Sequence, residues 1–174
     1  MASLAKHLQA MARNNAWANF RMLQACSRLT DEAYRARRTS FFPSIHLTLN
    51  HILVVDWYYL NVLDNGGRRW REIYAQGDAP CPTFEDVRRE QTAADRRLIA
   101  YCDALNAARL DDIVTLHRPG DLRYPERVHD VLAHLFQHDH HHRGQVHAML
   151  AGTFIQQDAP LRADDLRALG LPRR

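Results

Sequence analysis

Residues His134 to Met149 read HLFQHDHHHRGQVHAM and contain six of the protein's eleven histidines. On an α-helix each residue advances by roughly 100° around the axis. His138 and His142 then fall on the same face as the apolar residues of this segment, so they interrupt a core stripe. The other four either border that stripe (His134 and His141) or point nearly opposite, toward solvent (His140 and His147).

Two interpretations of the His138–His142 pair remain open from this segment alone. Imidazoles four residues apart on a helix can reach one cation. Each could instead be a hydrogen-bonded core residue, although burying two imidazoles requires two sets of polar partners. Further along the segment, Gln145 lies in the same stripe and could orient a ligand. We expect Arg143 to pair with an acid on a neighbouring helix and Gly144 to permit close helix approach.

A third ligand is available from the apolar segment at residues 43–64, PSIHLTLNHILVVDWYYLNVLD. His51 lies in the middle of its inward stripe, whereas His46 and Asp56 fall roughly 140° away and are not expected to touch a metal. If this helix packs against the histidine-rich helix, His51, His138 and His142 can converge. Three protein nitrogens with an open position are typical of a catalytic metal site rather than a closed structural one.

The periodicity predicts an all-α fold, a four-helix bundle formed by a single domain over residues 1–174. The expected helices span about 3–29, 43–64, 83–107 and 126–151, the last opened by Pro125-Glu126. Asn15 and Gln91 fall on inward stripes. Between the last two helices, residues 113–124 could form a short hairpin. A tail follows at 153–174, with a turn of helix at 163–169.

The composition narrows the functional classes. The 174 residues include no apolar run near the ~20 needed to cross a membrane, and the first residues are too polar for a signal peptide, so we expect a cytoplasmic protein. A net charge of +3 with scattered arginines argues against specific nucleic-acid binding. Cys26, Cys81 and Cys102 are too widely spaced to indicate a disulfide framework or a thiolate zinc site, and we interpret them as packing or surface thiols.

Three segments resemble the DinB (DinB/YfiT-like) family of metalloenzymes: RNNAWANFRMLQAC, SIHLTLNHILVVDWYYL and HLFQHDHHHRGQVHAML. The resemblance covers most of the chain and implies a four-helix bundle with up-down-down-up connectivity, often assembled as a homodimer. It also implies a metal triad of one histidine from the second helix and two from the fourth, which are here His51, His138 and His142. His134 stands where many members also have histidine, which implies hydrogen bonding within the pocket.

These features predict a metal-dependent enzyme of transferase or hydrolase type that acts on a small molecule. The resemblance adds a low-molecular-weight thiol as a co-substrate. Imidazole ligands suit a divalent ion, zinc or nickel first and iron or copper as alternatives. Apart from the metal site and Gln145, the sequence offers no general base, so the catalytic residues stay unknown. The alternatives are a non-catalytic metal-binding protein and a stress-response factor acting through a partner.

Overall fold

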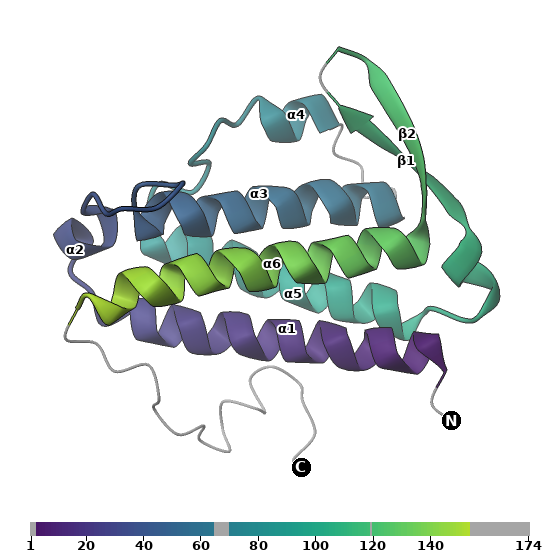
Figure 1. Ribbon diagram of the computed structural model, residues 1–174, viewed down its shortest axis with the longest axis horizontal. Coiled ribbons are helices and arrows are strands. Elements are labelled where there is room, and N and C mark those ends of the chain that lie inside the picture. Colours follow the sequence, from purple (N-terminus) through teal and green to yellow (C-terminus); the bar gives the residue numbers. More distant parts are fainter. Residues whose placement is uncertain (1–2, 65–69, 119, 154–174) are drawn as a thin grey trace.

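The amphipathic stretches of the sequence become long helices in the computed structural model, which describes residues 3–64, 70–118 and 120–153 (Figure 1). The described chain is mostly helical and carries one small antiparallel sheet. The helices are α1 (Leu4–Cys26), α2 (Asp31–Arg35), α3 (Ile45–Asp64), α4 (Trp70–Tyr74), α5 (Phe84–Asp103) and α6 (Val128–Ala151). A 3-10 turn, η1 (Ala108–Asp111), and the strands β1 (Ile113–Arg118) and β2 (Leu122–Arg127) complete the described elements.

The four long helices lie side by side in a closed ring of contacts (Figure 1). Helix α1 packs against α5 and α6, and α3 packs against the same two helices from the other side. Their apolar faces meet in one core, where Ile52, Leu53, Leu132 and Leu135 have no exposed surface. Burying each such side chain contributes about 1.5–3 kcal/mol relative to leaving it exposed. The ring therefore holds α3 and α6, the two histidine-bearing helices, in direct contact.

Side-chain caps fix where several helices begin. Thr83 accepts a hydrogen bond from the Asp86 backbone N–H at 3.1 Å and starts α5, as the sequence predicts. Thr30 does the same for the short α2 through Ala33 at 3.2 Å. Ser44 accepts from Leu47 at 3.1 Å, so α3 begins after Ser44 rather than at Pro43. Each of these oxygens satisfies a backbone N–H that has no partner within its helix.

The expected start of the last helix at Pro125-Glu126 is wrong. The hairpin predicted at 113–124 exists but runs three residues further, pairing Ile113 with Arg127 and Thr115 with Pro125. A proline lacks the N–H that a ladder needs, yet a two-stranded sheet consists only of edges and tolerates it. Helix α6 therefore begins at Val128, whose N–H donates to the Asp112 carbonyl at 3.0 Å.

Two further boundaries differ from the expected ones. Helix α5 ends at Asp103 rather than 107, with Ala104 as its C-cap. The η1 turn follows at Ala108–Asp111, where Asn106 accepts a hydrogen bond from the Arg109 N–H at 3.1 Å. Helix α1 ends at Cys26 rather than 29. Apart from Thr153, the predicted tail at 153–174 lies outside the described residues, and so does its helical turn at 163–169. None of the described helices is both long and apolar enough to cross a membrane.

Candidate metal centre

Histidines from two helices meet on the shared face of α3 and α6. His51 lies in the second turn of α3, and His138 and His142 lie one turn apart in the middle of α6. Each helix buries its apolar neighbours in the common core, which fixes how the two faces are turned toward each other. The three predicted residues are therefore brought together, across a separation of 87 residues between His51 and His138.

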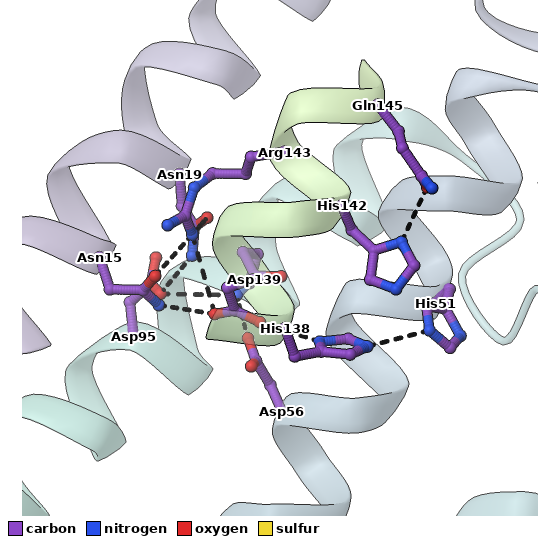
Figure 2. A network of polar contacts seen from close by, with 11 residues as sticks. Asn15, Asn19, His51, Asp56, Asp95, His138, Asp139, His142, Arg143 and Gln145 are labelled. Atoms are coloured by element: carbon purple, nitrogen blue, oxygen red, sulfur yellow. Dashed lines mark hydrogen bonds and ion pairs between the residues drawn. The ribbon is translucent and has the colours of Figure 1, made fainter. Parts of the chain in front are cut away.

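The three side chains have the geometry of a metal-binding group. One ligand nitrogen from each residue lies within 4.8 Å of the other two. The Nε2 atoms of His51 and His138 are only 3.0 Å apart (Figure 2). Nitrogens that share one tetrahedral zinc ion lie roughly 3.3 Å apart, given a Zn–N distance of roughly 2.0–2.1 Å. A divalent ion could be accommodated by small side-chain movements, so the donor set fits the group that the sequence predicts.

Gln145 orients one of the three rings. Its Oε1 lies 2.8 Å from Nδ1 of His142 and accepts that N–H, while its amide nitrogen lies 3.1 Å from Nε2 of His141. With the proton on Nδ1, the Nε2 atom of His142 keeps a lone pair. Gln145 therefore contacts a candidate ligand residue and is placed to fix its tautomer.

Asp139 orients a second ring from the protein interior. Nδ1 of His138 lies 3.4 Å from Oδ1 of Asp139, a carboxylate with no exposed surface. An N–H donated to this carboxylate leaves Nε2 of His138 unprotonated and facing His51. A carboxylate behind a histidine raises the basicity of the ring and fixes its tautomer, as is usual around protein metals.

Burial favours the neutral form of two candidate ligands. Burial, together with the neighbouring His142 and His138, lowers the pKa of His51 to about 4. Burial also lowers the pKa of His142 below its usual value. Only the neutral imidazole can ligate a metal. At neutral pH these two rings are therefore in the form that binds a cation.

A cavity of about 420 Å³ opens beside the triad and includes His51 and His138 in its wall. The ring of Phe42 stacks on His51 with centroids 4.2 Å apart and lies 5.7 Å from His142, which covers one side of the triad. Protein sites for small molecules have volumes of roughly 300–1,000 Å³. The open side of the triad therefore faces a space large enough for a small ligand.

Behind the triad, polar side chains from four helices form a buried network (Figure 2). Asn15 donates to Asp139 at 2.7 Å, and Asn19 donates to Asp95 at 2.8 Å. On α5, Gln91 donates to Asp56 at 2.6 Å. We call this set the polar network; it consists of Asn15, Asn19, Asp56, Gln91, Asp95, Asp139 and Arg143, whose hydrogen bonds or ion pairs link α1, α3, α5 and α6.

The charges of the network are only partly matched. Burial, reinforced by the Asp139 and Asp95 carboxylates, raises the pKa of Asp56 well above its usual value, which favours the protonated form of this carboxyl. Burial also raises the pKa of Asp95 to about 7. Asp56 is not one of the candidate ligands, as expected, and its side chain is buried.

Two expectations from the sequence are wrong. The acid nearest Arg143 is Asp139 on its own helix, at 3.8 Å, and the neighbouring α1 supplies Asn15 and Asn19, whose side-chain oxygens accept at 2.5 and 2.9 Å. No neighbouring helix packs closely on Gly144, since a Cβ placed there would have nothing within 4 Å.

The helical wheel places His140 and His147 toward solvent, and both are exposed. His141, at the border of the apolar stripe, is exposed as well. His134 is also exposed, at the edge of the cavity, with its ring 5.4 Å from that of Tyr59 and 6.4 Å from that of His138. His46 is a core residue with Nε2 3.1 Å from the Cys81 carbonyl oxygen. The three cysteines are all buried, which supports the packing interpretation.

Comparison with known families agrees with the geometry. The family model of the DinB family matches residues 2–152. The chain belongs to the DinB family. A comparison with curated proteins finds no match. The DinB match therefore covers α1 through α6, including all three histidines of the triad. It does not identify a substrate.

Sequence reasoning missed the polar network and the aromatic cover of the DinB triad. Asn15 and Gln91 were expected to face inward, but Asn19, Asp95 and Asp139 were not identified. A signal was available: the network residues recur four apart on one helix, as Asn15 with Asn19, Gln91 with Asp95 and Asp139 with Arg143. Polar residues repeated at this spacing beside an apolar stripe indicate a buried polar seam.

Proposed function

We propose that this DinB-family chain is a divalent-metal-dependent enzyme of transferase or hydrolase type. The observation that carries the proposal is the convergence of three histidine nitrogens within 4.8 Å beside a cavity of about 420 Å³. The metal ligands are His51, His138 and His142, and the fold is a single four-helix bundle with up-down-down-up connectivity. When bound, a divalent ion with three neutral ligands supplies a Lewis acid that can activate a water or a thiol.

The surrounding residues suit catalysis at such a centre. Gln145 and Asp139 fix the rings of His142 and His138, so the ligand positions are organised before a metal arrives. Phe42 keeps water from one side of His51. His134 lies at the cavity edge, where burial lowers its pKa and leaves the ring able to accept a proton from a bound ligand.

The triad is tested by metal content. Protein purified without a nickel column should contain about one equivalent of zinc or nickel, or of iron or copper, by elemental analysis. His51→Ala and His138→Ala should each lose most of it, because two remaining imidazoles hold a divalent ion much more weakly. His140→Ala, an exposed histidine on the same helix, is the matched control and should keep its metal. Stoichiometric metal in both triad variants would rule out this centre.

Catalysis is distinguished from metal storage by turnover. The exposed histidines His140, His141 and His147 favour a non-catalytic metal-binding or stress-response role, whereas the cavity beside the triad favours an enzyme. The metal-loaded protein should be assayed with low-molecular-weight thiols and electrophilic substrates, and with small hydrolysable esters and amides. Turnover that disappears in His51→Ala supports the enzyme. Stoichiometric metal with no turnover of any substrate supports the binding protein.

A further inference from the structure

The cavity beside the triad extends to the hairpin, where its wall includes the positively charged side chain of Arg118. Its wall runs from Phe42 and the triad members His51 and His138, past Tyr58 and Tyr59 of α3, to Arg118 at the end of β1. Phe42 contacts the triad rings, whereas Arg118 contacts the two tyrosines. The cavity thus has a histidine end and an arginine end, joined by a mostly aromatic and aliphatic wall that includes Val54 and Val55.

Contacts with α3 hold the Arg118 guanidinium in place. Its Nη2 donates to the Tyr59 hydroxyl at 3.2 Å, and its Cζ atom lies 5.2 Å from the centre of the Tyr58 ring. The Tyr58 hydroxyl donates to the His117 carbonyl at 2.7 Å, which ties β1 to α3 directly beside Arg118. A guanidinium carries its N–H donors in a planar fork, and the bond to Tyr59 fixes the orientation of that fork.

The charges around the cavity favour a single negative charge on the ligand. Among the described residues of the wall, the ionisable groups besides Arg118 are Asp78, His134 and the triad members His51 and His138. Burial lowers the pKa of His134, so that ring adds little positive charge at neutral pH. Asp78 is an exposed carboxylate that opposes a highly charged anion. The Arg118 guanidinium can balance one negative charge of a ligand, and the Asp78 carboxylate repels a second one. The cavity therefore suits a monoanion better than a dianion.

We propose that this cavity binds small molecules that carry one carboxylate, with Arg118 receiving the carboxylate and the triad end receiving the group that reacts. Planar carboxylates match the arginine fork and accept two parallel hydrogen bonds from it. The apolar body of the ligand lies against Val54, Val55 and Tyr58. The assignment of the reacting end rests on the proposed function, but the carboxylate site does not, because it is formed by β1 and α3 alone.

The test uses metal-free protein, so that its result is independent of the metal centre. Binding of 3-phenylpropionate, its neutral amide 3-phenylpropanamide and 2-phenylethyl phosphate is measured by ligand-observed NMR titration. The wild-type protein should bind the carboxylate about tenfold more tightly than the amide, as expected for a charge-assisted pair, and more tightly than the phosphate. The preference should vanish in Arg118→Gln and largely persist in Arg118→Lys.

Arg123→Gln is the matched control, because Arg123 lies on the same hairpin opposite His117 but is not part of the cavity wall. It should keep the full preference. Equal binding of acid and amide by the wild-type protein, or a preference that survives in a folded Arg118→Gln variant, would overturn the proposal. Tighter binding of the phosphate would overturn the monoanion assignment.

A second readout does not depend on the folding of Arg118→Gln. In ¹⁵N-labelled wild-type protein, the Nε–H signal that is missing from the Arg118→Lys spectrum should shift on adding 3-phenylpropionate and not on adding the amide. A signal unmoved at saturating acid would contradict the site. Zinc content is measured separately on metal-loaded samples of each variant, so failure of the triad and failure of the Arg118 site give different results.

Discussion

Asp139 has no exposed surface, yet it contacts a candidate metal ligand through a carboxylate oxygen 3.4 Å from His138 Nδ1. Asp139→Asn removes the charge while keeping the shape of the side chain. We expect metal affinity to fall by about 10–100-fold, as is usual when the carboxylate behind a histidine ligand is lost. Competition with a chelator of known affinity measures this. The electronic spectrum of the cobalt-substituted protein should change as well, which loss of stability alone would not cause.

Asp130→Asn is the matched control for Asp139→Asn, since Asp130 is an exposed aspartate on the same helix, away from the triad. It should bind metal as tightly as the wild-type protein. Equal affinities in all three proteins would show that Asp139 acts on the packing of the helices alone.

Asp95 should make stability depend on pH in a way opposite to an ordinary surface carboxylate. Burial raises its pKa to about 7 in the folded protein, above the usual value near 3.8. Between these values the folded state holds a proton that the unfolded state has released, so this contribution to stability falls as pH rises from about 4 to 7. Asp95→Asn removes the contribution. Relative to wild type, the variant should therefore become steadily more stable over this range, measured by urea unfolding of metal-free protein. A difference that does not change with pH would refute this.

The triad could be predicted from the sequence, because its three residues lie on apolar stripes whose period is visible in a single helix. The polar network could not be predicted in full. The partners of Asp139 come from α1 and α6, and Asp56 is matched by Gln91 of α5. Sequence spacing within one helix does not show which polar residue of another helix it will meet.

At the scale of the helix, the start of α5 rests on one hydroxyl. Thr83 accepts from the Asp86 N–H at 3.1 Å and donates to the Asp86 carboxylate at 2.6 Å. Thr83→Ala should destabilise the protein by about 1 kcal/mol, the usual effect of removing such a cap. Thr92→Ala changes the same residue type within the same helix, where the hydroxyl only donates to the Arg88 carbonyl. That variant should be neutral or slightly stabilised. Urea unfolding of both should separate them, and equal stabilities would contradict the cap.

The start of α5 was predicted well, and helix ends and junctions were not. Thr83 carries a local signal that needs no tertiary contact. Pro125 carries two opposite signals, because proline suits both the first turn of a helix and the edge of a sheet. The pairing of β2 with β1 decides between them, and the partner of Pro125 in that pairing is Thr115, ten positions earlier.

At the scale of the whole molecule, Arg143 joins α6 to α1. Its guanidinium donates to Asn15 and Asn19 and lies 3.8 Å from Asp139. Arg143→Met leaves the buried Asp139 without its cation, and we expect a loss of roughly 3–5 kcal/mol of stability. Arg97→Met removes the Arg97–Asp64 ion pair nearer the surface and should cost roughly 0–1 kcal/mol. Unfolding in urea compares the two. Similar losses in both variants would show that the network contributes little to stability.

The polar network also has a consequence for how the chain folds. Its hydrogen bonds span as many as 128 residues, from Asn15 to Arg143, and draw on four helices. Apolar surfaces can be buried in stages. A carboxylate that three helices enclose before the fourth has packed loses its hydrogen bonds to water and has not yet gained those to its protein partner. Partly assembled states are therefore destabilised, and the loss of stability grows with the number of network groups that they bury. The penalty favours a single cooperative folding transition, in which the helices that carry the histidines and the helices that support them become ordered together.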